Sequence, residues 1–466
     1  MFKFKKIKSV CLLIVMIMCV TSVGYANPIS DNISTENMYN HLLKIANEDN
    51  ARVAGLEGEY KAADYIHQEL EKYGLNVERQ KFPMTARLDS ASCVITESKK
   101  VYLNSTNFSY SPATPPEGIT AEIVFAGLGA KSDFKNIDVK GKIALIKRGA
   151  YSFYEKTQNA VNAGAIGVII YNNDIGVIKS GTLEKTTNIP AIALSGEDGD
   201  SLKSKLDSKE VVKATIKADN VEKNSYSENI IGTLNSDNPN AKTIVIGAHY
   251  DCVDTPGAND NGSGTVSLLE IARVLSSEQL NYNIKFIAFG SEEIGLIGSE
   301  KYVRDLSQSE LNNIHCMINL DMVGVGDTLG IFTSKRYTNS FIADLTEQYA
   351  SKLGIRYKRD ASTRSDHAPF EAVGIPVSFL MYEQDENYHT DKDTIENIQL
   401  ENLKNSCTIV TQMVCDISNV SPKKVKDLKM LKVKDNIEIK LDAKENNYDK
   451  SKLDEYDFEN PEFIKE

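Results

Sequence analysis

The sequence predicts an α/β protein: a mostly parallel, mixed sheet flanked by helices and interrupted by an inserted β-rich module. From residue 243 onward, near-continuous apolar runs alternate with helical patterns, which is typical of parallel strands buried on both faces. Between about residues 118 and 218 the runs are short, rich in β-branched residues and bounded by Gly or Asn. The composition, with 41% hydrophobic and 25% charged residues, is that of an ordinary globular protein.

The N-terminus has the layout of a secretory signal. Four lysines, at Lys3, Lys5, Lys6 and Lys8, precede an apolar run over residues 10–20, and small residues then lead to Ala26. The apolar run is well short of the ~20 residues that a membrane-spanning helix needs. We therefore expect a cleavable signal peptide over 1–26, a secreted, extracellular protein and no stable membrane anchor.

Charge and cysteine content exclude two further classes. Acidic residues outnumber basic ones by 65 to 53, for a net charge of −12, which argues against a nucleic-acid partner. Five cysteines remain after the signal, an odd and scattered set that does not fit a disulfide scaffold. The fold is therefore expected to depend on its hydrophobic core.

The element pattern changes along the chain. Residues 37–73 read as helical, and 75–112 read as short alternating strands. Within the β-rich module one helix is expected over 153–165. Strands are then expected in TIVIGA, IKFIAF, CMINL, LGIF and PVSFLMY, with helices over 266–275 and 341–353.

The last part of the chain is heavily charged. After about residue 420 the sequence contains no Gly and many Lys, Asp and Glu residues, so a solvated or poorly ordered tail is the preferred interpretation. Alternation in LKVKDNIEIKLD leaves an exposed strand pair as the alternative.

Histidine and carboxylate side chains follow the predicted parallel strands, each near the point where a strand ends. They are His249, Asp251, Asp260, Glu292, Glu293, Asp321 and His389. Ligand sites of open α/β sheets form at this edge, so we expect these side chains to meet. Imidazole with carboxylate suits zinc better than magnesium or calcium.

The charge balance favours two zinc ions. Asp260, Glu293 and Asp321 supply three negative charges, so a single divalent ion would leave one of them uncompensated. Two ions with a bridging hydroxide come to neutrality, which avoids the desolvation cost of unpaired buried charge. The count alone leaves a single zinc open.

The adjacent Glu292 and Glu293 have a specific chemical use. If one carboxylate binds metal, the other can act as general base on the metal-held water. The alternative is a solvated pair at a helix start, stabilised by the helix dipole.

The ordered set HYD, GANDNGSG, SEE, NLDM and YHTDKDT resembles the co-catalytic double-zinc peptidases. That family includes aminopeptidase Y, secreted bacterial aminopeptidases and the glutamate carboxypeptidases, and the resemblance covers about residues 36–112 and 219–418. RSDHAPF, residues 364–370, is characteristic of the aminopeptidase branch. The resemblance implies a zinc exopeptidase-like fold and a metallo-aminopeptidase that hydrolyses N-terminal amino acids from peptides or proteins.

The resemblance also implies the ligand sets. His249, Asp260 and Asp321 would hold one zinc. Asp260, Glu293 and His389 would hold the other, with Asp260 bridging. A cis peptide bond after Asp260 is expected as well.

The remaining roles are catalytic. Glu292 would be the general base, and Asp251 would orient His249. Tyr388 and Arg364 would stabilise the oxyanion or bind substrate.

The module around residues 118–215 resembles a protease-associated domain, on the stretches GKIALIKRGAYSFYEKTQNAVNAGAIGVIIYNN and NIPAIALSGEDGDSL. It would overhang the site and restrict the substrate. Tyr151 stands where such domains often have Cys. The predicted domains are a signal peptide at 1–26, a peptidase domain at 27–112 and 219–420, the protease-associated insertion at 113–218, and the tail at 421–466.

Other functions remain as alternatives. A glutamate-carboxypeptidase-like exopeptidase shares the zinc set, but usually adds a long helical C-terminal domain. A glutaminyl cyclase works with one zinc. A non-catalytic, receptor-like binding protein would use the same scaffold after losing metal ligands, whereas every expected ligand is present in this sequence.

Overall fold

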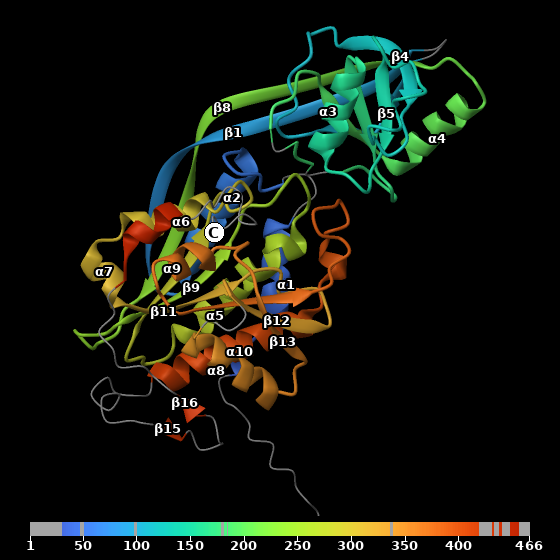
Figure 1. The fold of residues 1–466 in the computed structure, drawn as a ribbon. Helices are drawn as coiled ribbons and strands as arrows, with labels where there is room; N and C mark the ends of the chain where they lie inside the picture. The colour runs from blue at the N-terminus through green and yellow to red at the C-terminus, as the bar shows by residue number, and fades with distance from the viewer. Residues whose placement is uncertain are drawn as a thin grey trace, which may run out of the picture.

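The computed structural model describes residues 30–46, 51–96, 100–178, 181–183, 185–335, 339–418 and 448–455, with the backbone of 431–432 and 438–439. The signal peptide predicted at 1–26 lies outside the described residues. Figure 1 shows a large lobe and a small lobe joined by the long strands β1 (Asn76–Thr96) and β8 (Lys213–Leu234). Among the described residues, no helix is long and apolar enough to cross a membrane.

The sheet of the large lobe has the strand order β13-β12-β14-β11-β9-β10-β8. Its further strands are β9 (Thr243–His249), β10 (Asn283–Phe289), β11 (Ile314–Leu320), β12 (Thr328–Thr333), β13 (Tyr357–Ala361) and β14 (Val377–Glu383). The four central strands, β14, β11, β9 and β10, are parallel, whereas β12 and β8 join the sheet antiparallel. This confirms the predicted mostly parallel, mixed sheet.

Helices cover both faces of this sheet. One core contains side chains of α1 (Thr35–Ile45), α2 (Glu57–Lys72), α5 (Gly264–Leu275), α8 (Phe341–Lys352) and α10 (Leu400–Ser418). The opposite core contains side chains of α6 (Ile297–Asp305), α7 (Gln308–Asn313) and α9 (His367–Ala372). In β9, Ile244 and Ile246 enter the first core and Val245 enters the second, as the two-residue period of a strand requires. Burial on both faces explains why these strands are continuously apolar.

The helical pattern over 37–73 forms two helices rather than one. Ser34 caps the start of α1 by accepting a hydrogen bond from the Asn37 N–H at 3.1 Å, and α1 ends at Ile45. Before α2, Gly55 has φ +74°, a left-handed conformation that interrupts helical geometry. The buried Arg52 guanidinium donates to the carbonyl oxygens of Ile45 and Tyr250. These contacts hold the intervening segment in a non-helical path.

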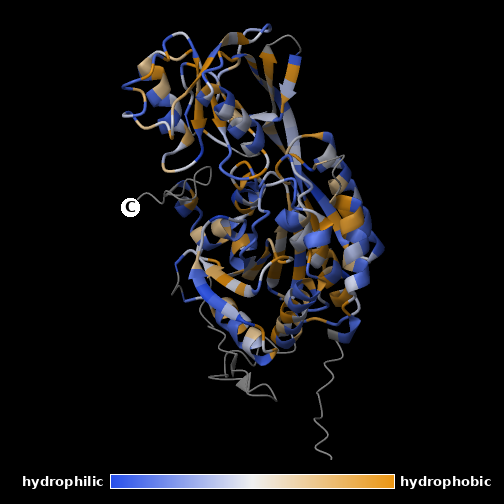
Figure 2. Cartoon of the chain, turned by 90° about the vertical axis from the view of Figure 1, so that its right-hand side faces the viewer, coloured by the Kyte–Doolittle hydropathy of each residue, from blue (hydrophilic) through white to orange (hydrophobic). Residues whose placement is uncertain are grey.

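The small lobe contains the strands β4 (Ile119–Phe125), β5 (Ile143–Lys147), β6 (Gly167–Tyr171) and β7 (Ala191–Leu194), which pair in parallel in that order. β3 (Ser105–Asn107) pairs antiparallel with β7. The predicted helix over 153–165 is α3 (Phe153–Ala163), and α4 (Gly196–Asp207) is a further helix. Figure 2 shows the hydrophobic colouring concentrated on the strands at the centre of this lobe, which has its own core clusters.

The region 75–112 is less segmented than the short runs predicted. β1 is a single strand of 21 residues and pairs antiparallel with β8 from Asn76 opposite Thr233 to Ile95 opposite Ala214. β2 (Lys100–Leu103) pairs with its far end. The two long strands therefore form a ribbon that carries the small lobe.

The expectation of a solvated tail is wrong for part of the C-terminal region. β15 (Leu431–Lys432) and β16 (Glu438–Ile439) pair antiparallel, which is the alternative that the alternating sequence allowed. Further along, Tyr448 and Leu453 are buried in the core beside α6, α7 and α9. Two apolar side chains therefore anchor this short segment, which includes η4 (Lys450–Glu455), despite its charged surroundings.

Candidate metal centre

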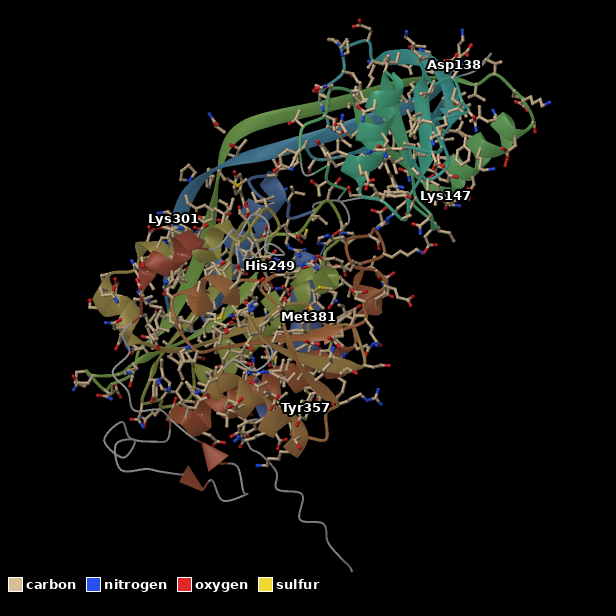
Figure 3. The ribbon with its side chains drawn as sticks, viewed as in Figure 1. Asp138, Lys147, His249, Lys301, Tyr357 and Met381 are labelled. Carbon is tan, nitrogen blue, oxygen red and sulfur yellow. The ribbon has the colours of Figure 1, made fainter. Side chains whose placement is uncertain are left out.

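The predicted site residues lie at the carboxyl edge of the four central parallel strands. His249 is the last residue of β9, and Asp321 directly follows β11. Glu292 and Glu293 follow β10, His389 follows β14, and Asp260 lies between β9 and α5. Neighbouring parallel strands end side by side, so residues remote in sequence meet at one edge. Figure 3 shows His249 in the large lobe, on the side toward the small lobe.

The Asp260 carboxylate lies between the two histidines. Its Oδ1 is 3.4 Å from His249 Nε2, and its Oδ2 is 2.9 Å from His389 Nε2. Around His249 Nε2, Asp321 Oδ1 is at 3.3 Å and Glu292 Oε2 at 3.9 Å. Glu293 Oε2 is 3.1 Å from His389 Nε2. Each oxygen of Asp260 therefore faces a different group of donors.

These donors fit metal ions. Ligand atoms of His249, Asp260 and Glu293 lie within 4.8 Å of one another, as do those of His249, Glu292 and Asp321. Glu293 Oε1 is buried and has no hydrogen-bond partner within the described part of the chain. An unsatisfied buried carboxylate oxygen is costly unless a cation compensates it. Imidazole nitrogen with carboxylate oxygen is a zinc-type donor set.

The electrostatics of the cluster favour uptake of positive charge. Burial, with the neighbouring carboxylates of Glu293 and Asp321, raises the pKa of Glu292 well above its usual range. Burial likewise raises the pKa of Glu293. For His249 burial favours the neutral ring, yet the nearby Glu292 and Asp321 raise its pKa well above the usual value. Without a metal, the cluster therefore needs bound protons to offset its negative charge.

Asp251 lies where the sequence placed it, beside His249. The His249 Nδ1 atom is 3.2 Å from the Asp251 carbonyl oxygen and 3.6 Å from its carboxylate Oδ1. The Asp251 carboxylate also accepts hydrogen bonds from the backbone N–H groups of Glu292 at 3.0 Å and Glu293 at 3.1 Å. The turn that carries the two glutamates is thus attached to the loop that carries His249.

Tyr388 borders the cluster through its neighbour His389, and both Tyr388 and Arg364 are exposed. Tyr388 is 39% exposed as a residue, and its ring stacks on His389 with centroids 3.8 Å apart. His389 itself has φ +55°, a left-handed conformation that costs energy for a non-glycine residue. Burial and the carboxylate charges raise the pKa of Tyr388, while the charge of the exposed Arg364 opposes this shift. Tyr388 therefore lies within the electrostatic influence of the cluster, and the charge of Arg364 acts on Tyr388.

Three contacts at the site escaped the sequence analysis. Ser365 Oγ donates to Asp321 Oδ2 at 2.7 Å and accepts from Asn319 Nδ2 at 2.7 Å. Asn261 Nδ2 donates to the Leu320 carbonyl oxygen at 2.9 Å. Ser365 belongs to the RSDHAPF motif, which therefore pointed to a second site residue besides Arg364. The expected cis peptide bond joins Asp260 to Asn261.

Comparison with known proteins identifies the family and the inserted domain. Residues 229–414 match the model of peptidase family M28, and residues 119–202 match that of the PA domain. Aminopeptidase YwaD of Bacillus subtilis (strain 168) is 35% identical over 444 residues, covering 89% of this chain and 93% of that protein.

Two solved structures share the architecture. BSAP, a zinc aminopeptidase from Bacillus subtilis, superposes with a TM-score of 0.72 at 35% identity, covering 83% of this chain and 95% of that chain. An aminopeptidase from Aneurinibacillus sp. strain AM-1 gives a TM-score of 0.62 at 37% identity, covering 83% and 94%. The resemblance seen in the sequence motifs is thereby confirmed. The chain belongs to peptidase family M28 and carries a PA domain within its peptidase fold.

Proposed function

We propose that this chain is a secreted, two-zinc aminopeptidase that removes N-terminal amino acids from peptides. The observation that carries the proposal is the Asp260 carboxylate, which directs one oxygen toward His249 and the other toward His389. Relatives named as aminopeptidases, one of them a zinc enzyme, support the same activity. Residues 1–26 would direct export and would be removed from the exported protein.

Five side chains would hold the metal ions. His249, Asp260 and Asp321 form one set, and Asp260, Glu293 and His389 form the other. Bound zinc would polarise the scissile carbonyl and lower the pKa of a bound water toward ~7. Asp251 would keep His249 in one orientation through the contacts at its Nδ1 atom.

Glu292 would handle the proton. It is adjacent in sequence to the ligand Glu293, and its backbone is fixed by Asp251. As general base it would take a proton from the attacking water, and it would then give that proton to the leaving amine. The Tyr388 hydroxyl and the Arg364 guanidinium would donate hydrogen bonds to the oxyanion or to the substrate.

Selectivity for chain ends would come from charge. Glu292 belongs to neither ligand set, so its carboxylate would remain uncompensated after metal binding and would attract a free, protonated α-amine, whereas an acetylated amine carries no charge. The PA domain would limit which chains reach the site. We assign it to residues 113–218, between peptidase segments 27–112 and 219–420, with the tail at 421–466. The far end of β1 and strand β3 belong to segment 27–112 in this division, yet they pack with the small lobe, so the structural unit begins before residue 113.

A panel of aminoacyl chromogenic substrates tests the proposal. Each substrate is paired with its N-acetylated form and assayed with and without chelator. We expect hydrolysis of the free-amine substrates, loss of that activity with chelator and its return with zinc. Equal hydrolysis of the acetylated substrates would refute amine recognition, and chelator-resistant activity would refute the metal.

A further inference from the structure

The loop that carries His389 reaches Asp260 at two points. His389 Nε2 is 2.9 Å from the Asp260 carboxylate. Four residues later in the same loop, Asp393 Oδ2 accepts a hydrogen bond from the Asp260 backbone N–H at 3.0 Å. One short loop therefore contacts both the side chain and the backbone of the same residue.

The Asp393 carboxylate also holds the residue before Asp260. Its Oδ1 accepts the Asn259 N–H at 2.6 Å, and the Asp393 carbonyl oxygen accepts the Ala258 N–H at 3.1 Å. Asp393 is only 2% exposed. A buried carboxylate with two consecutive N–H donors forms directional, charge-assisted hydrogen bonds. It therefore restricts where the backbone of the 258–260 segment can lie.

This backbone segment needs external support. Asp260 has φ −107° and ψ 97°, outside helical values, although the helix α5 follows closely. Its N–H group is buried and donates to Asp393 rather than to a helical carbonyl. A buried N–H group without an acceptor is costly, so loss of Asp393 would favour another backbone arrangement. That rearrangement would move the Asp260 carboxylate.

We propose that Asp393 is a positioning residue that fixes the backbone of Asp260 and so sets its carboxylate between His249 and His389. The role rests on the proposed two-metal function, because the quantity it controls is the affinity of the site for metal. Asp251 offers an internal parallel: it follows His249 in its loop and accepts the two consecutive N–H groups of Glu292 and Glu293. Each histidine loop thus clamps the backbone of a carboxylate-bearing turn.

Asp393→Asn is the substitution that tests this role most specifically. It keeps the shape of the side chain but leaves one oxygen acceptor for two N–H donors. Asp385→Asn is the matched control, because Asp385 lies in the same loop and accepts from the Asn259 side-chain amide at 2.8 Å, without contacting the Asp260 N–H. Both changes replace a carboxylate of the same loop by an amide, so any effect common to that replacement is shared by the two variants.

Two measurements are made on each protein. Zinc affinity is determined by competition with a chromogenic chelator, and hydrogen exchange is followed in the metal-free protein by mass spectrometry. We expect Asp393→Asn to weaken zinc binding by about 10–100-fold. It should also speed amide exchange in peptides that contain residues 258–262, while Asp385→Asn stays close to wild type in both measurements.

Two results would overturn the role of Asp393: wild-type zinc affinity in Asp393→Asn, or equal losses in both variants. If Asp393→Asn fails to fold, hydrogen exchange in the wild-type protein still tests the role of Asp393. The wild-type Asn259 and Asp260 amides must be protected in the folded, metal-free state, and exchange at the unprotected rate contradicts the clamp. A wild type that binds no zinc would instead refute the proposed function, and the exchange result would be judged separately.

Discussion

Glu292 and Glu293 occupy adjacent positions with different surroundings. Glu293 lies 3.1 Å from the imidazole of His389, whereas Glu292 lies 3.9 Å from that of His249. Both backbone N–H groups are held by Asp251, so the two side chains leave a fixed turn. The pair can therefore divide into one ligand and one base without moving the backbone.

Replacement of Glu292 by Gln tests this division. The amide keeps the size of the side chain but cannot accept the water proton, so kcat should fall by at least ~100-fold. Zinc content should stay at the wild-type level, because Glu292 belongs to neither proposed ligand set and the glutamine keeps a side-chain oxygen beside His249 and Asp321. Metal analysis and steady-state kinetics on the same preparation check both parts. Near-normal turnover would contradict the assigned base.

At this scale the sequence predicted the residues that chemistry makes conspicuous. Histidines and carboxylates at strand ends could be named because strand position alone brings them to one edge. Ser365 and Asp393 could not, since their roles depend on loops whose paths are set by tertiary contacts. A serine or an aspartate in a loop has many ordinary uses, and only the distances to Asp321 and Asp260 distinguish these two.

Among the elements, β1 shows why an alternating pattern can mislead. Phe82 and Ala86 are buried at even positions, whereas Cys93 and Ile95 are buried at odd positions further along the same strand. The buried face changes because the strand leaves the large lobe and packs its far end in the core of the small lobe. In the sequence, the shift of the buried residues from even to odd positions looks like the boundary between two short strands.

A buried histidine in the central strand β11 should make the stability of the protein depend on pH. His315, in β11, is packed between the rings of Tyr282 and Phe341, with centroids 5.1 and 5.0 Å away. Burial, with the positive charge of Lys242, lowers the pKa of His315 from its ordinary 6.5 to about 3. The unfolded chain then binds the extra proton between pH 6.5 and 3. Stability should fall with decreasing pH in that window, by about 1.4 kcal/mol per unit for this group.

His315→Phe removes that titration while keeping an aromatic ring in the strand. The free energy of unfolding of each protein is measured by urea titration at pH 6 and pH 4. Between these pH values it should fall less steeply for His315→Phe than for the wild type, and the two slopes should differ by about 1.4 kcal/mol per pH unit. Tyr282→Phe alters the same pocket without removing the histidine and should keep the wild-type slope. Identical slopes for His315→Phe and wild type would show that His315 does not contribute.

For the whole molecule, two lobes with separate cores share one ribbon. The β1–β8 ribbon links a sheet whose carboxyl edge carries the candidate metal centre to a lobe that holds none of the proposed ligands. The sequence predicted this division because the short, β-branched-rich runs begin near residue 118 and end near residue 218. It did not predict the ribbon itself, which is defined by pairing between strands far apart in the sequence.

Because the two lobes have separate cores, we expect metal removal to affect the large lobe and not the small one. Chelation should increase amide exchange in segments 249–262, 291–294 and 386–394, because the buried carboxylates lose their compensating charge. Bound zinc at a free concentration of 100 Kd stabilises the folded state by about 2.7 kcal/mol, so the large lobe should also unfold more readily. Strands β5 and β6 should keep their protection. Equal loss of protection there would show that the lobes are coupled.

The central claim is that Asp260 would serve as a ligand to two zinc ions. Its most direct test is the zinc content of the purified protein, compared with Asp260→Ala and His389→Ala, with activity measured on the same samples. The account predicts two zinc ions per active wild-type chain, loss of both in Asp260→Ala, and retention of one in His389→Ala. A fully active wild type that holds a single zinc, or an Asp260→Ala protein that still holds both, would contradict it.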